Sequence, residues 1–326
     1  MTPTERVTGK RPVRVVRTDP HVAVLVVFHQ NVQHTLSCIG SAVGLDYPSF
    51  EVVAVDDGST DGCAAAVEAT YPNVRILRGD GNLWCNGGFN FGLRDCMQRG
   101  LEYVLLLNND NVIAPEALRF LMESERQQHP CVVGSVVVSS ASADIVSYVG
   151  KRMNWSTGQP TSLYEGAPLS SLPAGPLLVD SMGFQGVLIP RQVFDAVGLI
   201  DDLTFKHYFG DTDFYLRAAE SGFPIMIDCR SVISEDQSTK GRDGPEPTLR
   251  GFVANLFSIR SVAHVPSRYR FYRRHVPDRW WVTFGRYYGS LFRAQVATML
   301  KYRLRQVQGE NGRIEKFLRR IVGKAS

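Results

Sequence analysis

Residues 50–62 read FEVVAVDDGSTDG, an apolar run of strand length that ends in acidic and glycine residues. The run Phe50–Val55 is rich in valine, as a strand buried on both faces of a parallel sheet requires. Three similar runs occur at Val22–Phe28, Val74–Leu77 and Tyr103–Leu107. Ligands of open parallel sheets bind at the carboxyl ends of the strands, so the polar residues that follow these runs are the first site candidates.

Helix-like segments separate the four runs, at Gln33–Val43, Gly62–Thr70, Asn86–Arg99 and Pro115–Gln127. This alternation is typical of parallel strands joined by crossover helices. Pro115 suits a first helical turn, where its missing N–H costs nothing. The sequence therefore predicts an α/β fold with a doubly wound, Rossmann-like and mostly parallel central sheet.

The middle of the chain changes character. Between Cys131 and Ile200 the sequence predicts strands and loops, because Gly, Ser and Pro cluster there. Phe214–Ser221 is helix-like and Ile225–Ile227 resembles a short strand, whereas Glu235–Pro247 is polar and rich in turn residues. We interpret Glu235–Pro247 as a candidate active-site lid.

Length and composition suit one large domain with an appendage, since the chain has 326 residues and is 44% hydrophobic. We expect an N-terminal extension over residues 1–20, a main domain over 21–250 and a basic, mainly helical region over 251–326. Six scattered cysteines form no Cys-x-x-Cys pair, which favours a reducing cytoplasm. No apolar stretch is long enough for a signal peptide or a membrane span, so we expect neither.

The basic region differs in charge from the rest of the chain. Residues 251–326 hold 16 Lys and Arg against 3 Asp and Glu, a net charge of +13, and the remaining 20 and 29 give −9. Arginines with aromatic residues between them suit an anionic membrane surface or a nucleic acid. A solvated helical face, or a face that forms a homo-oligomer, explains the same pattern.

Two motifs place oxygen ligands directly after predicted strands. Asp56 and Asp57 can accept hydrogen bonds from a base or ribose, although an Asp-Gly turn before a helix cap explains them equally. Residues 105–111 read LLLNNDN, and an acidic side chain with amide neighbours suits Mg²⁺ or Mn²⁺ that shares its coordination with substrate phosphates. The alternative is a helix cap ahead of Pro115, which a single Asp or Asn satisfies.

Two further motifs precede predicted helices. In residues 209–217, FGDTDFYLR, Asp213 can cap the helix or pair with Arg217, which leaves Asp211 to act as a base. Residues 81–90, GNLWCNGGFN, combine glycines that let the backbone approach a ligand with amides that can bind a ribose or pyrophosphate. A glycine-rich turn that opens a helix is the alternative, and Trp84 can pack on the sugar or fill the core.

In this order, the motifs resemble family 2 glycosyltransferases of the GT-A fold, particularly bacterial rhamnosyltransferase-like members, over approximately residues 20 to 240. The matching stretches are residues 24–28, VDDGSTDG at 55–62, GNLW at 81–84, NGGFN at 86–90, LLLNND at 105–110, GVLIPR at 186–191 and GDTDF at 210–214.

The resemblance implies the roles of individual residues. Asp211 corresponds to the catalytic base, and Asp110 to the direct metal ligand of the family's DxD motif, with Asn108 standing where the first Asp is expected. The family's further His ligand has no counterpart in residues 232–238, where Asp236 or Glu235 could substitute. Donor-binding candidates are Val27, Phe28, Asp56, Asp57, Gly81, Asn82, Trp84, Asn86, Gly87, Asn90, Asn108 and Asn109. Acceptor-side candidates are Gln185, Gly186, His207 and Asp213.

The resemblance also implies an inverting transfer of a sugar from a nucleoside diphosphate to a saccharide or lipid-linked saccharide, with a divalent cation as cofactor. L-Rhamnose from a dTDP-linked donor is the first expectation, and galactofuranose or glucose from UDP follows. The expected location is the cytoplasm or the inner face of the plasma membrane, where cell-surface glycans are assembled. The alternatives are a nucleotide-sugar sensor, a sugar nucleotidyltransferase and a nucleic-acid-binding protein, and the last explains none of the carboxylate motifs.

Overall fold

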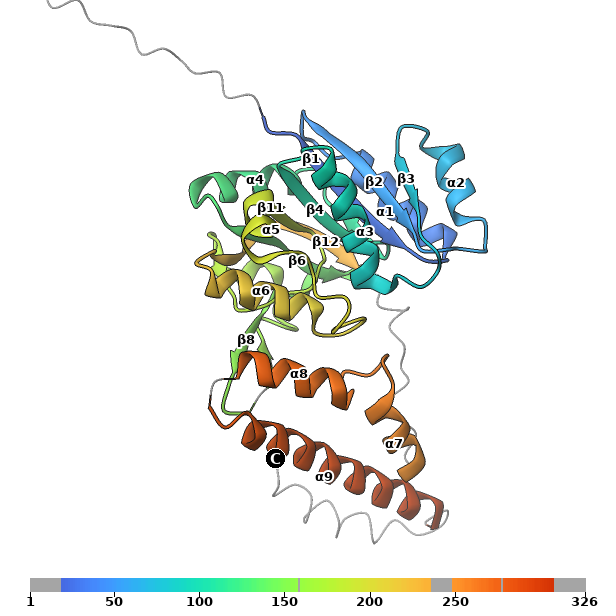
Figure 1. Cartoon of the computed structure of the whole chain (residues 1–326), viewed down its shortest axis with the longest axis vertical. Helices are drawn as coiled ribbons and strands as arrows, with labels where there is room; N and C mark the ends of the chain where they lie inside the picture. The colour runs from blue at the N-terminus through green and yellow to red at the C-terminus, as the bar shows by residue number, and fades with distance from the viewer. Residues whose placement is uncertain (1–18, 158, 236–247, 277, 308–326) are drawn as a thin grey trace, which may run out of the picture.

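The computed structural model describes residues 19–157, 159–235, 248–276 and 278–307. Its N-terminal half alternates strands and helices (Figure 1). The strands are β1 (Val22–Phe28), β2 (Phe50–Asp56), β3 (Arg75–Arg78) and β4 (Tyr103–Asn108). The helices are α1 (Val32–Val43), α2 (Cys63–Thr70), α3 (Trp84–Gln98) and α4 (Ala117–Gln127). These eight elements were predicted from the sequence and are confirmed, with every end within two residues of its predicted position.

The second half adds strands that run in both directions. These are β5 (Asn111–Ile113), β6 (Val132–Ser139), β7 (Ser142–Tyr148), β8 (Lys151–Asn154), β9 (Gln159–Ser162), β10 (Leu177–Leu178), β11 (Val187–Pro190) and β12 (Ile225–Glu235). The helices are η1 (Leu169–Ser171), α5 (Arg191–Val197), α6 (Gly210–Glu220), α7 (Leu249–Phe257), α8 (Val265–His275) and α9 (Trp280–Val307). Strand β12 extends well beyond the short strand expected at Ile225–Ile227, because residues 228–235 continue its pairing with β6.

One large sheet runs through the domain in the order β10-β12-β6-β11-β4-β1-β2-β3. Strands β3, β2, β1 and β4 are parallel, as the alternation of strands and helices predicted. Strand β11 is antiparallel to both of its neighbours, β4 and β6. The predicted α/β class is confirmed, and the sheet is mixed because β11 joins the parallel N-terminal half to the β6–β12 pair.

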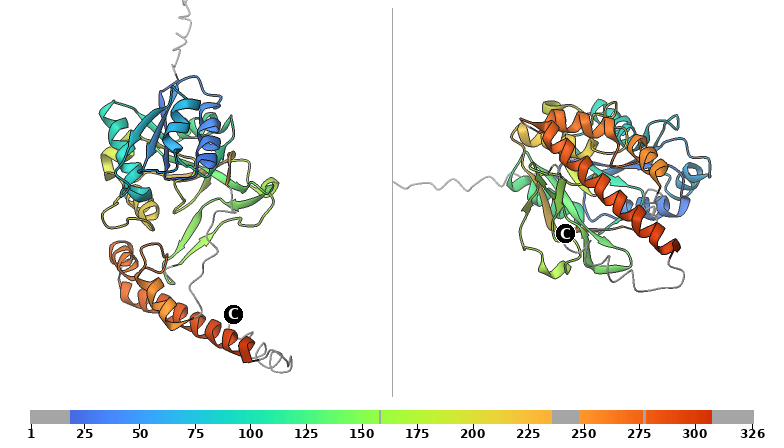
Figure 2. Two further views of the ribbon diagram at one scale, coloured as in Figure 1. Left: turned by 90° about the vertical axis from the view of Figure 1, so that its right-hand side faces the viewer. Right: turned by 90° about the horizontal axis from the view of Figure 1, so that it is seen from below.

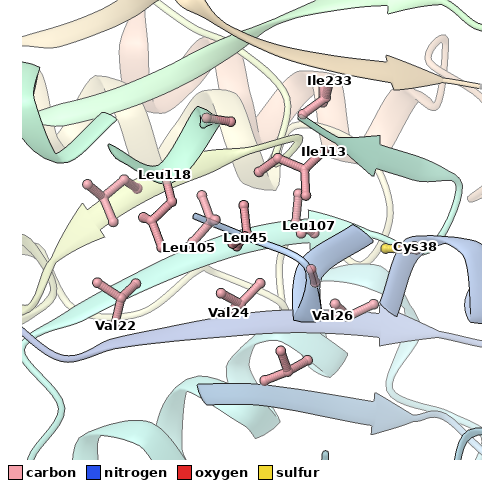
Figure 3. Close-up of a cluster of buried hydrophobic side chains, with 14 of the residues drawn as sticks. Val22, Val24, Val26, Cys38, Leu45, Leu105, Leu107, Ile113, Leu118 and Ile233 are labelled. Carbon is pink, nitrogen blue, oxygen red and sulfur yellow. The ribbon is translucent and has the colours of Figure 1, made fainter. Parts of the chain in front are cut away.

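Two apolar layers enclose this sheet. Along β1, Val22, Val24 and Val26 belong to the layer that α1 and α4 cover, and Ala23 and Leu25 to the layer that α3 covers. Figure 3 shows the first layer, where Val24 and Leu105 project from neighbouring strands. All five β1 residues are fully buried. Burial on both faces explains why the strand is an unbroken apolar run.

The C-terminal helices α7, α8 and α9 lie together beyond one end of the sheet domain (Figures 1 and 2). A third apolar cluster joins them to the domain, because Phe271 and Tyr272 of α8 pack with Phe205 and with Leu216 of α6. The β8–β9 hairpin reaches the same layer, where Trp155 accepts a hydrogen bond from Thr283 of α9 at 3.4 Å. In the part of the chain that is described, no helix is long and apolar enough to cross a membrane.

Candidate active site

A cavity of about 440 Å³ opens where the carboxyl ends of β1, β2 and β4 meet. Val27 and Phe28 from β1, Asp57 after β2, and Asn108, Asn109 and Asp110 at the end of β4 line it. Gly81, Trp84, His207 and Arg260 also contribute to its wall. This is the position predicted for a ligand of a parallel sheet.

Asp57 holds the Gly81–Trp84 loop in place. Its Oδ1 accepts hydrogen bonds from the backbone N–H groups of Gly81 and Leu83, both at 3.1 Å, and its Oδ2 accepts one from Trp84 at 2.9 Å. Gly81 has a φ of +83°, which glycine adopts without strain. Gly58 packs against it so closely that a Cβ on Gly58 would lie 2.8 Å from the Gly81 Cα. Asp57 thus lines the cavity while most of its acceptor capacity orders the loop.

Several residues expected to bind the donor instead support the fold. Asp56 does not line the cavity and accepts a hydrogen bond from the Ser59 backbone at 2.8 Å. Asn82 is exposed and lies outside the cavity wall. Asn109 lines the cavity, but its amide donates to Thr35 on α1. Asp56 and Asn82 thus lie outside the wall of the cavity in which the donor was expected, whereas Asn109 remains in it.

The amides of α3 attach residues 200–205 to this helix. Asn90 exchanges two hydrogen bonds with the Ile200 backbone, and Asn86 donates one to the carbonyl of Phe205. Gly87 packs against Asp202, where a Cβ would lie 3.3 Å from a carboxylate oxygen. Asn86, Gly87 and Asn90 are therefore buried supports rather than the donor ligands that the sequence suggested. From the sequence alone, an Asn that binds a ligand cannot be told from an Asn that binds the backbone of a distant segment.

This attachment brings the starts of α3 and α6 together. A Cβ on Gly210 would lie 2.3 Å from the Asn86 amide, so only glycine allows this approach. Cys85 is consequently close to carboxylates from two elements. Burial, with the negative charges of Asp211 and Asp110, raises the pKa of the Cys85 thiol to about 12. The charges of both the predicted metal ligand and the predicted base therefore act on the Cys85 thiol.

Asp211 lies on the wall of a second cavity, of about 400 Å³. Burial raises the pKa of Asp211, while the Lys151 ammonium and a 2.7 Å hydrogen bond from the Thr212 backbone act in the opposite direction. Lys151 belongs to the same wall. His207 lines the first cavity and the next residue, Tyr208, lines the second, so their ring contact at 4.6 Å marks the boundary between the two.

Asp213, two residues further on, is fully buried and lines neither of these cavities. It pairs with Arg217 at 2.9 Å, Arg274 at 2.7 Å and His275 at 2.8 Å. Burial alone would raise the pKa of Asp213, but hydrogen bonds from His275, Arg274 and Arg217 outweigh it and the pKa is lowered. The helix-pairing role weighed for Asp213 fits these contacts, and an acceptor-side role does not.

The remaining acceptor-side candidates do not line the Asp211 cavity. Gln185 donates to Glu235 at 2.9 Å, and Gly186, with a φ of +65°, packs against Ser135; neither lines a cavity. His207 lies in the wall of the strand-end cavity with Asp110 rather than beside Asp211. Asp236, and all but the first residue of the candidate lid Glu235–Pro247, lie outside the described residues.

The oxygen and nitrogen donors of the first cavity suit a divalent cation. Asp110 supplies a carboxylate and Asn108 an amide oxygen from the same strand end. Burial, and after it the positive charge of Arg260, lowers the pKa of His207, and its buried Nδ1 has no hydrogen-bond partner in the described structure. A neutral imidazole with an open nitrogen is the form that binds metals. Among the described residues no group of three or more His, Cys, Asp or Glu is arranged to hold a metal ion, so a cation here would need oxygen ligands from substrate phosphates.

Two cavity residues gave no usable sequence signal. The His29 ring hydrogen-bonds the Asp57 carbonyl at 2.8 Å, which places it on the cavity wall. Arg260 lies over the Trp84 ring, with 5.5 Å from its guanidinium carbon to the ring centroid. Arg260 comes from the basic region, and only its packing against residues from α3 reveals that it belongs to this cavity.

Comparison with known proteins gives a family for part of the chain. Residues 23–168 match the model of the family described as Glycosyl transferase family 2. The succinoglycan biosynthesis protein ExoO of Rhizobium meliloti is 30% identical over 105 residues, which cover 32% of this chain and 29% of that protein. The undecaprenyl-phosphate mannosyltransferase of Micrococcus luteus is 27% identical over 183 residues, or 55% of this chain and 70% of that protein.

A solved structure supports the fold over most of the chain. The mannosyltransferase PcManGT of Pyrobaculum calidifontis, in complex with GDP-Man and Mn²⁺, aligns with a TM-score of 0.58 and 14% sequence identity. The alignment covers 95% of this chain and 81% of that one. At this level of identity the likeness establishes a shared GT-A-like fold and no more.

Proposed function

We propose that this chain, in which residues 23–168 form a glycosyltransferase family 2 domain, transfers a sugar from a nucleoside diphosphate to an acceptor hydroxyl with inversion. The observation that carries the proposal is a pair of adjoining cavities, one at the strand ends and one between the start of α6, the β8–β9 hairpin and the C-terminal helices. Asp110 lines one and Asp211 the other, and the two cavities adjoin where the rings of His207 and Tyr208 are in contact at 4.6 Å. Donor and acceptor can therefore meet between them.

The strand-end cavity is the donor side of this proposal. Trp84, with Arg260 over its ring, offers a flat surface for a base or sugar, and Gly81 lets the backbone approach the ligand. Asp110, Asn108 and His207 are the residues that would hold a divalent cation. That cation would supply Lewis-acid stabilisation of the charge on the departing diphosphate.

Asp211 is the general base of this proposal. It removes the proton of the acceptor hydroxyl as the acceptor oxygen forms a bond to the anomeric carbon. The bond between that carbon and the diphosphate oxygen breaks at the same time, and the nucleoside diphosphate leaves with the electron pair. Attack from the side opposite to the leaving group inverts the anomeric configuration. Lys151 in the same wall favours the carboxylate form of Asp211, which a base requires.

The donor is proposed from resemblance, with dTDP-L-rhamnose first and UDP-linked galactofuranose or glucose next. GDP-mannose joins the panel because PcManGT binds GDP-Man. Thermal shift of the full chain with each nucleotide sugar, with Mg²⁺ or Mn²⁺ and with neither, should give one donor that raises the melting temperature most. Binding of several nucleotide sugars without turnover on any acceptor, in the presence of either metal, would instead support a sensor.

We also propose that the enzyme acts at a membrane surface, through an apolar stripe on α9. Trp281, Phe292, Val296 and Leu300 are each at least 37% exposed. At about 100° per residue they fall within roughly 100° of the helix circumference. Arg286 and Arg293 are exposed beside them, which suits anionic headgroups. Figure 2 shows α9 on the face that points away from the sheet domain.

Flotation of the full chain with vesicles tests the stripe. Vesicles that contain phosphatidylglycerol should carry the chain upward, and Phe292→Asp with Leu300→Asp should release it. Val43→Asp changes an exposed residue of similar kind on α1 and serves as the control. Equal flotation of all three proteins, or none for the native chain, would rule out the stripe as a membrane contact, and a concentration-dependent mass would then indicate a homo-oligomer.

A further inference from the structure

The second cavity has walls from three parts of the chain that are distant in sequence. Lys151 and Met153 come from the β8–β9 hairpin, and Tyr208 and Asp211 from the start of α6 and the loop before it. Arg268 of α8 and Tyr287 of α9 complete it. The cavity that holds the proposed base is thus closed by the basic C-terminal helices.

Arg268 is a buried cation in this wall. The residue is only 6% exposed, and its guanidinium carbon lies 3.6 Å from the centroid of the Tyr287 ring. It donates hydrogen bonds to the Tyr272 hydroxyl and to the Val262 carbonyl, both at 2.9 Å. Its Nε–H has no hydrogen-bond partner among the described residues. Of the five N–H groups of an arginine, two therefore have named acceptors.

Arg268 differs from the other arginines that pack against the interior. Arg217 and Arg274 pair with Asp213, and Arg230 pairs with Asp228 at 2.8 Å. Across the described chain, no carboxylate lies within ion-pair distance of Arg268. Burial of a charge without a counterion is costly, and stacking on the rings of Phe209, Tyr272 and Tyr287 offsets part of that cost. The described fold therefore leaves the charge of Arg268 without a counterion.

The electrostatics of the cavity favour a negatively charged ligand. Lys151 and Arg268 are the cations among its lining residues, and Asp211 is the single carboxylate there. Lys151 offsets the charge of Asp211, because its ammonium acts to lower the pKa of that carboxyl. Arg268 is left with no anion to balance it. The planar guanidinium is also the group best suited to bind a carboxylate or phosphate through parallel hydrogen bonds.

We propose that Arg268, supported by Lys151, binds an anionic group of the acceptor, either a carboxylate or a phosphate, close to the hydroxyl that Asp211 deprotonates. The inference rests on the proposed function in one respect, that the Asp211 cavity is the acceptor side. It adds the chemical class of the acceptor, and it assigns the C-terminal helices to substrate recognition.

Binding to the full chain tests this without turnover. Titration calorimetry compares methyl β-D-glucuronide, glucose 6-phosphate and neutral methyl β-D-glucoside. We expect one or both charged sugars to bind more tightly than the neutral one. Arg268→Gln should weaken that binding by about 10- to 100-fold, since hydrogen bonds to charged groups contribute about 1.5–3 kcal/mol. Preference for the glucuronide indicates a uronic acid in the acceptor, and preference for the phosphate indicates a phosphorylated acceptor.

Control variants separate recognition from folding. Arg270→Gln removes an exposed arginine of the same helix and should leave binding unchanged. Lys151→Gln changes a partly exposed residue of the same cavity. It should weaken binding of the same ligand, and it replaces Arg268→Gln as the test if that variant does not fold. Equal affinity for charged and neutral sugars, or loss of affinity in Arg270→Gln equal to that in Arg268→Gln, overturns the inference.

Donor binding distinguishes the two proposals. A native chain that binds a nucleotide sugar but shows no preference for charged sugars contradicts the anionic acceptor alone. A chain that binds the charged sugars through Arg268 but binds no nucleotide sugar contradicts the proposed function alone.

Discussion

Asp211 and Asp213 are two residues apart on α6 and have opposite environments. Asp211 borders a cavity, where burial raises its pKa, while Asp213 is enclosed by Arg217, Arg274 and His275, which lower its pKa despite its burial. When the environments of two carboxyl groups shift their pKa values in opposite directions, the two groups can take different roles, one chemical and one structural. The sequence motif contains both aspartates, and the contacts distinguish them.

Asp211→Asn tests the chemical role. We expect transfer to fall by about 10²- to 10⁴-fold because the amide cannot accept the proton. Affinity for the nucleotide sugar should change little, since Asp211 does not line the donor cavity. Initial rates and donor titrations on the same preparation measure both quantities. Full activity in a correctly folded Asp211→Asn would remove Asp211 from the mechanism.

The same substitution should not destabilise the fold at neutral pH. The pKa of Asp211 is higher in the folded chain than in the unfolded chain. Its contribution to stability is therefore present below the unfolded pKa and is lost as pH rises through the folded pKa. Because Asp211→Asn removes a carboxylate that is costly to ionise, the variant should be at least as stable as the native chain at pH 7. Thermal unfolding of both proteins measures this difference.

Lys151 gives a prediction on the pH dependence of transfer. The acidic limb of kcat/KM should lie above the ordinary range of an aspartate, because burial raises the pKa of Asp211. Lys151→Met removes a charge that lowers this pKa, so the limb should move to higher pH. Arg270→Gln, at an exposed position outside the cavity, controls for a general change in charge. An unchanged or lower midpoint in Lys151→Met would contradict the coupling.

At the scale of elements, the glycines of α3 decide how closely this helix approaches β1. A Cβ on Gly88 would lie 2.5 Å from a methyl group of Val27, and one on Gly92 would lie 2.3 Å from a methyl group of Leu25. The motif predicts a donor contact for the neighbouring Gly87, which packs against Asp202. Helix–strand packing was not predictable from the motif, because it depends on which residue of β1 faces the helix.

Gly88→Ala tests this packing. The added methyl must displace Val27, which costs about 1–3 kcal/mol of stability and weakens donor binding because Val27 lines the donor cavity. Gly285→Ala is the matched control in α9, where nothing lies within 4 Å of the added Cβ. There the substitution should stabilise the chain by about 0.5–1 kcal/mol. Denaturant unfolding of both variants should give changes of opposite sign.

At the scale of the whole molecule, Asp213 connects the sheet domain with the C-terminal helices. It joins α6 to Arg274 and His275 of α8, next to the apolar cluster of Phe205, Phe271 and neighbouring residues. The charge of the chain changes sign at about residue 250. The contacts of Asp213 and the walls of both cavities instead tie the basic region to the site, through Arg260 on one side and Arg268 on the other.

Asp213→Asn should weaken this connection. Removing one partner of a buried ion-pair network costs about 3–5 kcal/mol, because the cations remain without a counterion. The pKa of Asp213 is lower when folded, so its contribution is present above the unfolded pKa and is lost as pH falls through the folded pKa. Asp213→Asn should therefore be less stable at pH 7 and lose less stability in acid. Asp195→Asn, which alters an exposed pair with Arg191 on α5, should unfold as the native chain does.

The sequence by itself determined the α/β class, the four parallel strands and the strand ends at which the site forms. These depend on local composition and on the doubly buried strands, which leave an unbroken apolar run. Only the tertiary structure decided which polar residues after those strands face a cavity. Asn86 and Asn90 could equally bind a ligand or the backbone of residues 200–205, and the choice depends on a segment more than 100 residues away. Arg260 and Arg268 reach the cavities for the same reason, because the contacts that place them join distant parts of the chain.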